Sequence, residues 1–390
     1  MNKQTNVMRI YITIVCISVL QGLQYGPTPV LAGISEHYPS VSQSMVQMLI
    51  TAPALVGMVF ALLCGVLVTK ISKKKLLLAA ALVAFLSGMA PLLVDNFWFL
   101  LAMRLVYGFS LGLATALNTA VVAEWFEGDA RVIAMGVQSA SVGAGIALIG
   151  ALSGQLGNKY FANSYFINII GAISFILILF CLPDTGISEA EGGKGAKVNS
   201  RVFLIALLAF LENLFLISYT TNIAMHIEGS FENSASMAGM LTSVFSGAQI
   251  VIGLLLGIVS KVTKKATMTT AMFSFAIGAA VLVAFPANLP MLCIGSFLCG
   301  FSQGCFIPTS MVEASNAVPA AAAAMAAGIL SSANCLGQIV SPFVLNTLAR
   351  TFFGSAAPGN VYKLCSIGMV ISGIAAWFIM RENNTGDGSQ

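Results

Sequence analysis

The sequence has very little charge for its length. Asp, Glu, Lys and Arg make up 8% of 390 residues, and hydrophobic residues make up 58%. Soluble domains are about a quarter charged, so a water-soluble fold is excluded. His is nearly absent, with two residues, and the eight Cys form no CxxC pair. We therefore expect no metal site, no cofactor and no enzyme active site, which would need clustered His, Asp or Glu.

Long apolar segments take up most of the chain. Charges, Pro, Gly and Asn divide it into twelve such segments, near residues 8–34, 44–69, 76–94, 97–122, 132–156, 162–182, 202–225, 236–260, 267–286, 290–312, 323–349 and 361–380. A helix of about 20 apolar residues crosses the hydrocarbon core of a bilayer. The sequence therefore predicts an all-α, multi-pass membrane protein with twelve transmembrane helices.

The Lys and Arg residues are distributed unevenly over the connections between these segments. Fourteen of the eighteen fall on the side that holds both termini, three fall on the other side, and Arg104 lies inside a segment. Cytoplasmic loops carry the excess of basic residues in membrane proteins. We expect both termini to be cytoplasmic and the protein to lie in the cell membrane (inner or plasma). Because the basic residues sit at segment ends, the net charge of +4 does not indicate nucleic-acid binding.

The two halves of the sequence repeat one another. The basic turns TKISKK (69–74) and SKVTKK (260–265) lie 191 residues apart, and RLVYGFSLG (104–112) shares its GFSxG core with SFLCGFSQG (296–304) at a shift of 192. At the same shift Gly136 and Gly145 fall on Gly328 and Gly337. A Gly-rich polar stretch, 184–200, lies between the halves and reads as a flexible cytoplasmic linker.

Six segments before the linker and six after it, in the same orientation, form a parallel repeat. We expect two six-helix bundles, 1–183 and 201–390, joined by the linker 184–200. Parallel repeats of this kind place a substrate path between two halves that rock about it. A secondary transporter is therefore the leading interpretation.

Three motifs resemble those of the major facilitator superfamily, and the resemblance covers essentially the whole chain. The loop after the second segment reads Gly65-Val-Leu67-Val-Thr69-Lys70-Ile-Ser72-Lys73-Lys74. It keeps the family's Gly, Leu and basic positions but has Thr69 where the family has a gate-locking Asp. The acidic run 124–131 could pair with Lys70 or Lys73 instead. The resemblance thus implies a cytoplasmic gate formed by Gly65, Thr69, Lys70, Lys73, Glu124 and Arg131.

The other two motifs lie in the fourth and fifth segments. The run 104–112 matches the motif in which the family has a membrane-embedded arginine, so the resemblance implies proton coupling or substrate handling at Arg104. The fifth segment keeps two glycines of the drug/proton-antiporter motif, Gly136 and Gly145, but lacks its Gly-Pro. Antiport of drugs is therefore supported only in part.

Two ionisable side chains lie well inside the predicted membrane layer. At 1.5 Å per residue, Arg104 is roughly 10 Å from the outer boundary and Glu212 roughly 15 Å from the start of its segment. Such groups usually face a cavity or one another. We expect Glu212 to gain and lose a proton, in competition with the substrate. The structural alternative is a static Glu212–Arg104 pair, or a hydrogen bond from Glu212 to a neighbouring helix.

Polar residues at helical spacing accompany these two. The candidate substrate- or proton-binding residues are Arg104, Glu212, Gln21, Gln24, Tyr25, Asn118, Asn213, Tyr219, Asn222 and Gln303. Any single Gln or Asn among them could instead join two helices. The sequence predicts a monomeric, proton-coupled transporter of a small organic solute. Efflux of amphipathic drugs and uptake or exchange of a small organic anion both stay open, and so does a non-transporting membrane sensor.

Overall fold

The computed structural model describes residues 3–126, 128–187, 199–318 and 323–381, and every regular element in them is a helix. Eleven stretches in these residues are long and apolar enough to cross a membrane. One of them, Ser234–Ala284, contains two helices, so the predicted count of twelve is approximately met. The all-helical fold class is confirmed. The last-but-one helix continues to Phe353, beyond its predicted end, because helix formation does not stop where the apolar run stops.

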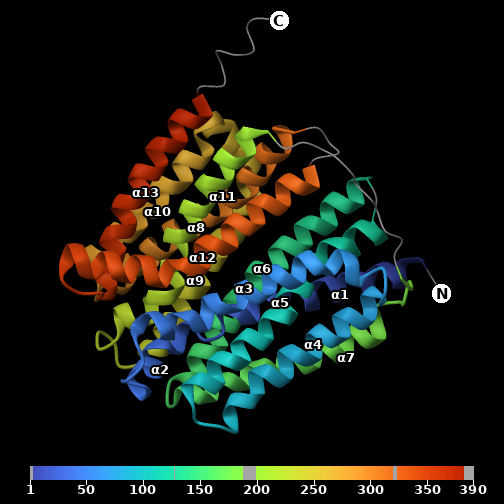
Figure 1. Ribbon diagram of the computed structural model, residues 1–390, viewed down its shortest axis with the longest axis horizontal. Coiled ribbons are helices and arrows are strands. Elements are labelled where there is room, and N and C mark those ends of the chain that lie inside the picture. Colours follow the sequence, from blue (N-terminus) through green and yellow to red (C-terminus); the bar gives the residue numbers. More distant parts are fainter. Residues whose placement is uncertain (1–2, 127, 188–198, 319–322, 382–390) are drawn as a thin grey trace, which may run out of the picture. The chain divides into compact units, whose positions relative to one another are not determined.

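The chain divides into two compact units (Figure 1). Unit 1 comprises Met1–Gly192 and Asn233–Ser243. Its elements are α1 (Lys3–Gly22), η1 (Leu23–Tyr25), η2 (Thr28–Val30), α2 (Leu31–His37), α3 (Gln43–Leu67), α4 (Lys73–Met89), η3 (Ala90–Leu92), α5 (Phe97–Trp125), α6 (Gly128–Gly157), η4 (Phe161–Asn168), α7 (Ile169–Cys181) and the first residues of α9. Within it, α5 packs along α1, α3 and α4, and α1 also packs along α6 and α7.

Unit 2 comprises Gly193–Glu232 and Val244–Gln390. Its elements are α8 (Ser200–Ile227), the larger part of α9 (Ser234–Thr263), η5 (Lys264–Ala266), α10 (Thr267–Ala284), α11 (Leu289–Asn316), α12 (Ala323–Phe353) and α13 (Pro358–Arg381). Here α8 packs along α11, α12 and α13, and α10 packs along α11 and α13. Most of the predicted linker, residues 188–198, lies outside the described residues, and the predicted domain boundaries stay a prediction.

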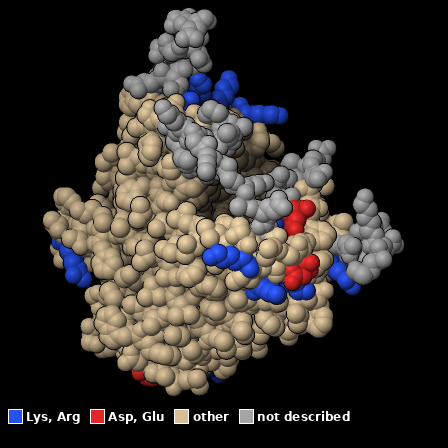
Figure 2. All heavy atoms as spheres, turned by 45° about the vertical axis from the view of Figure 1, so that its right-hand side comes forward, with Lys and Arg blue, Asp and Glu red and all other residues tan. Residues whose placement is uncertain are grey.

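The outer surface is apolar, as a lipid-facing surface must be. In Figure 2 the Lys, Arg, Asp and Glu side chains form a few small groups on a surface that is otherwise uncharged. Exposed side chains include Leu62 on α3, Leu254 on α9 and Ile371 on α13. Contiguous apolar surface of this extent is rare on soluble proteins. The backbone polar groups of such a surface are satisfied inside the helices, which lets the helices lie in lipid.

The first span is broken at the sequence Gly26-Pro27-Thr28-Pro29. Helix α1 ends at Gly22, two short 3₁₀ turns follow, and regular helix resumes at Leu31. Pro has no N–H and clashes with the preceding turn, so two prolines separated by one residue interrupt the helical hydrogen-bond ladder. The backbone carbonyls at the break must find other partners.

The close helix contacts within unit 1 recur within unit 2 at the same shift of 192 residues. Gly108 lies against the carbonyl of Pro53, and Gly300 lies against that of Phe245. Likewise Gly145 lies against the carbonyl of Ser18 in unit 1, and Gly337 lies against that of Phe210 on α8 in unit 2. Small residues let two helix backbones approach closely. The sequence repeat is therefore also a repeat of packing.

We predict that Gly108→Ala destabilises the protein by about 1–3 kcal/mol, because overpacking forces neighbouring helices apart. A Cβ at position 108 would lie 2.6 Å from the carbonyl oxygen of Pro53 and 2.7 Å from Cβ of Val56. Gly136→Ala is the matched control, since a Cβ there meets nothing within 4 Å. Alanine should stabilise that half-buried helical position by about 0.5–1 kcal/mol. Thermal unfolding in detergent compares the two; equal effects would contradict the packing argument.

Candidate functional site

Arg104 on α5 is buried and bound by backbone carbonyls of its own unit. It is 7% exposed. Its Nε donates to the carbonyl of Leu49 at 2.7 Å, its Nη1 to that of Leu23 at 3.3 Å, and its Nη2 to that of Gln24 at 2.5 Å. The guanidinium also lies over the ring of Tyr107, 4.9 Å from the ring centroid. The donors of Arg104 are thus directed at protein backbone.

The break in the first span explains this arrangement. Two of the three carbonyls, those of Leu23 and Gln24, belong to the short 3₁₀ turn that follows α1. The Tyr107 hydroxyl donates to the carbonyl of Leu20 at 2.7 Å, and the Ser153 hydroxyl donates to that of Gly26 at 2.5 Å. A buried carbonyl without a partner costs free energy comparable to a lost hydrogen bond. These side chains therefore satisfy the backbone where the helix cannot.

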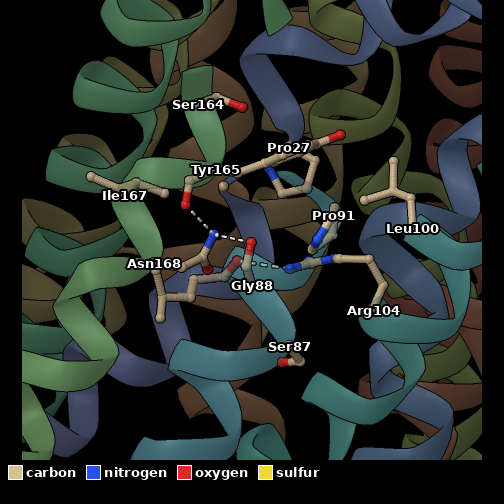
Figure 3. A pocket seen from close by; sticks show the side chains of 12 residues that line it. Pro27, Ser87, Gly88, Pro91, Leu100, Arg104, Ser164, Tyr165, Ile167 and Asn168 are labelled. Carbon is tan, nitrogen blue, oxygen red and sulfur yellow. Dashed lines mark hydrogen bonds between the residues drawn. The ribbon is translucent and has the colours of Figure 1, made fainter. Parts of the chain in front are cut away.

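A small cavity lies beside Arg104 in unit 1 (Figure 3). Its volume is about 20 Å³, enough for about one water molecule. Figure 3 shows Arg104 reaching toward it from one side and Asn168 from the other. The Asn168 amide donates to the carbonyls of Tyr165 at 2.8 Å and Gly88 at 3.3 Å. The cavity is too small for an organic solute.

Glu212 on α8 is also buried, but unlike Arg104 it is not hydrogen-bonded to the described residues. Its side chain is 0% exposed, and neither carboxylate oxygen has a hydrogen-bond partner among the described residues. None of the salt bridges among the described residues involves Glu212. The alternative of a static hydrogen bond to a neighbouring helix is therefore not realised. An ionised carboxylate placed in this way would be very costly, whereas a neutral acid is tolerated.

Most of the other predicted polar residues are hydrogen-bonded inside their own unit. In unit 1 the amide of Gln21 donates to the Ala114 carbonyl at 3.4 Å and that of Gln24 to the Ile50 carbonyl at 3.2 Å. The Asn118 amide donates to the Ser18 hydroxyl at 2.9 Å, and its oxygen has no hydrogen-bond partner among the described residues. Tyr25 is half-buried.

The set in unit 2 is similar. Asn213 donates to Asn334 on α12 at 3.5 Å, and the Tyr219 hydroxyl donates to Ser296 on α11 at 2.7 Å. The Asn222 amide donates to the Ser218 carbonyl of its own helix at 3.0 Å. Gln303 is half-buried, and its amide oxygen has no partner among the described residues. The structure thus does not gather these residues around one open cavity within either unit.

Comparison with known proteins identifies the family. The sequence model described as the Major Facilitator Superfamily matches residues 12–213 and 202–389, which is nearly the whole chain. This chain belongs to the Major Facilitator Superfamily. It is therefore a multi-pass membrane protein with a transporter fold. A comparison with curated proteins found no match.

Solved structures of transporters have the same fold as this superfamily member. The D323A mutant of the nucleoside transporter NupG superposes with a TM-score of 0.77 at 15% identity, over 95% of this chain and 99% of that one. A D-xylose–proton symporter gives 0.72 at 15% identity, over 95% and 98%. A bacterial homologue of the human lysosomal transporter Spinster gives 0.71 at 14%, over 97% of each chain. Identities this low show the fold and nothing finer.

Two of the residues predicted to form a cytoplasmic gate, Lys73 and Glu124, form an ion pair. Lys73 at the start of α4 donates to the Glu124 carboxylate near the end of α5 at 2.9 Å, one of the two pairings expected. Thr69 donates to the Val66 carbonyl of its own helix, Gly65 has no neighbour within 4 Å of an added Cβ, and Lys70 is exposed. The side chain of Arg131 lies outside the described residues. Whether the pair acts as a gate stays a prediction.

We predict that Lys73→Gln and Glu124→Gln each cost less than about 1 kcal/mol of stability, because the pair is partly exposed to water. If the pair holds the gate, each variant changes the transport rate, and the charge-reversed pair Lys73→Glu with Glu124→Lys restores it. Transport by all four proteins in vesicles checks this. A reversed pair that transports no better than the single variants would remove the gate role.

The sequence did not predict an ionic cluster of His37, Tyr38 and Asp95 in unit 1. His37 and Tyr38 both contact Asp95, at 3.0 Å and 2.5 Å. The Tyr38 hydroxyl, and then the His37 ring, lower the pKa of the Asp95 carboxyl. Because the folded-state pKa lies below the unfolded one, the cluster stabilises the fold above the usual Asp range and loses this effect as the pH falls through the lowered value. These groups are exposed, so the effect is small.

Sequence reasoning also missed the residues that support the broken span. Ser153 and Tyr107 act through carbonyls, and no sequence pattern reports which carbonyls a break leaves free. It missed Gln249 as well, a half-buried residue on α9 whose amide oxygen has no partner among the described residues. A signal for Gln249 existed, because it replaces Gly57 in the repeat of 192 residues.

Proposed function

We propose that this protein is a monomeric secondary transporter that moves a small organic solute by alternating access, coupled to protons, across the cell membrane with both termini in the cytoplasm. The family and fold support transport in general. The observation that carries proton coupling is Glu212, which is enclosed in unit 2 without a hydrogen-bond partner among the described residues.

The physical argument concerns which form of Glu212 this conformation holds. A neutral carboxyl costs little more than a buried hydroxyl or amide, whereas an unpaired carboxylate would cost far more. The enclosed state is therefore a proton-loaded state. Release of the proton requires a second state in which water or a cationic group reaches the carboxylate. A site that is closed in one state and open in another links proton release to the conformational cycle.

The hydrogen bonds of Arg104 favour a neutral or cationic solute over an organic anion. An anion carrier led by Arg104 would need guanidinium donors directed at the solute, but three of them are directed at the carbonyls of Leu49, Leu23 and Gln24. We therefore propose antiport of a neutral or cationic amphipathic compound against protons, rather than binding of an organic anion at Arg104. Among proteins with this fold, the D-xylose–proton symporter is named for proton coupling.

Among the predicted contact residues, two keep unused hydrogen-bonding capacity. Asn118 and Gln303 each have a buried amide oxygen without a partner in the described part of the chain. We propose these as contacts of the solute or of the proton site. Gln21, Gln24, Tyr25, Asn213, Tyr219 and Asn222 are weaker proposals, since several of them already join helices.

Transport by purified protein in liposomes tests the proposal. With a proton gradient imposed in either direction, a panel of neutral, cationic and anionic organic solutes is offered. We expect accumulation of a neutral or cationic solute against its own gradient, with matching proton movement. Accumulation that depends only on an anion would overturn the solute class, and no movement of any solute would leave the membrane-sensor alternative.

A further inference from the structure

Glu212 is not the only buried polar group of unit 2 that lacks a partner. The amide oxygens of Gln249 on α9 and Gln303 on α11 are also buried without a hydrogen bond among the described residues. Both are acceptors, and a protonated carboxyl is a donor. Three helices of one unit thus carry one donor and two acceptors that could satisfy one another.

The hydrogen bonds between α8 and α11 place Glu212 and Gln303 at the same level. Tyr219 contacts Ser296 near one end of the helix pair, at 2.7 Å, and Arg201 contacts Glu313 near the other, at 3.0 Å. The two helices are therefore antiparallel. Glu212 lies seven residues before Tyr219, and Gln303 lies seven residues after Ser296. At 1.5 Å per residue, each is about 10 Å from the Tyr219–Ser296 contact along its helix.

The helical period also places them on facing sides. Seven residues return to almost the same face of an α-helix, because two turns take 7.2 residues at 3.6 per turn. Glu212 therefore shares the face of Tyr219 that meets α11, and Gln303 shares the face of Ser296 that meets α8. Helix α12 contacts the opposite side of α8, where the Ser341 hydroxyl donates to the Leu214 carbonyl at 2.6 Å.

Helix α9 closes this region from a third side. The ring of Phe245 stacks on that of Tyr219, with centroids 4.6 Å apart. A Cβ at Gly304 would lie 2.8 Å from the carbonyl oxygen of Gln249. The backbone of Gln249 therefore lies against α11 one residue from Gln303, at the level of Glu212.

We propose that Gln303 binds the protonated form of Glu212, with the carboxyl O–H donating to the amide oxygen of Gln303. This inference rests on the proposed function, since it takes Glu212 as the proton carrier. When the carboxyl loses its proton it can only accept, so the Gln303 amide must turn to present its N–H₂ group. The amide oxygen of Gln303 then points away from Glu212 and can accept a hydrogen bond from another group. Gln303 thus converts the proton state of a buried acid into a change of hydrogen-bonding pattern.

No other described charge interferes with this pairing. The charged groups on α8 and α11 are Arg201 and Glu313, which bind one another near the helix ends. The lysines and arginines on the other packed helices, Lys261, Arg350 and Lys363, are exposed near helix ends, and His226 lies fourteen residues, about 21 Å, along α8 from Glu212. The remaining titratable groups are tyrosines and thiols: Tyr219, Cys293, Cys299, Cys305, Cys335, Tyr362 and Cys365. Tyrosine and an unperturbed thiol are neutral at neutral pH. The state of the Glu212 carboxyl is then reported by its amide partner alone.

Infrared difference spectroscopy of the purified full-length protein tests the pairing directly. The carbonyl stretch of a protonated carboxyl moves to lower frequency when its O–H is hydrogen-bonded. We expect a carboxyl band that titrates with pH and is absent in Glu212→Gln. In Gln303→Leu the band should shift to higher frequency. In Gln47→Leu, which removes a buried glutamine of α3 in unit 1, the band should not move.

Each other outcome is informative. An unshifted band in Gln303→Leu overturns the pairing, and a shift in Gln249→Leu alone assigns the acceptor to α9 instead. Both results leave proton-driven transport by the wild type intact, so the proposed function survives them. If no carboxyl band disappears in Glu212→Gln, the proton site of the proposed function fails, whatever the role of Gln303. A circular dichroism spectrum matching wild type shows that each variant is folded.

Discussion

Glu212→Gln is expected to abolish proton-driven accumulation of the solute while leaving exchange of solute for solute. With one proton exchanged per solute, a gradient of one pH unit supports about a tenfold accumulation, since 1.4 kcal/mol is a factor of ten. The amide cannot release a proton, so this ratio should fall to one. It can still donate a hydrogen bond as the neutral acid does, so the fold and the exchange step should remain. Counterflow and gradient-driven uptake in the same liposomes measure both.

The control for this variant is Glu313→Gln, which removes a carboxylate of the same unit from a partly exposed pair with Arg201. It should keep the pH dependence of accumulation. Equal loss in both variants would indicate a general effect of charge on unit 2. Gradient-driven accumulation that persists in Glu212→Gln would remove Glu212 from the coupling mechanism, and the search would move to other titratable groups.

Arg104→Leu is expected to destabilise the protein by about 2 kcal/mol or more. The substitution leaves the carbonyls of Leu49 and Gln24 without the guanidinium donor, whereas that of Leu23 keeps the Gly26 N–H at 3.2 Å. Each unpaired buried acceptor costs about 1–3 kcal/mol. Relief from burying the charge offsets part of this. Arg104→Lys should lie between leucine and wild type, because an ammonium group cannot reach three carbonyls in the geometry of the guanidinium fork.

Thermal unfolding in detergent, without solute, measures this loss. Arg350→Leu is the matched control, since Arg350 is an exposed arginine at the end of α12. We expect little change there. A stable Arg104→Leu protein that binds solute poorly would contradict the supporting role, and would return Arg104 to the solute site that the sequence suggested.

Several features of the fold followed from short-range information. The length of the apolar runs predicted the spans, and the two prolines after Gly26 account for the break in the first one. The repeat of 192 residues predicted which helices would correspond, and the glycine contacts follow the same shift. Each of these depends on residues near one another in sequence or on an internal copy. Such patterns can be recognised without knowledge of tertiary contacts.

The candidate site followed only in part. The sequence predicted that Arg104 and Glu212 lie inside membrane spans, because each is a charged residue in the middle of an apolar segment. What each one binds could not. Arg104 binds carbonyls that lie 80 and 81 residues away in the chain and a third that lies 55 away. Backbone carbonyls leave no trace in a sequence, since every residue has one.

The sequence by itself determined that this chain is an all-helical, duplicated membrane protein, because the need to satisfy backbone groups in lipid leaves few folds for runs of this length and apolarity. The tertiary structure alone decided that Arg104 is hydrogen-bonded, whereas the Glu212 carboxyl has no hydrogen-bond partner among the described residues. That difference depends on which donors and acceptors meet across helices, and these meetings are set by packing between segments far apart in the chain.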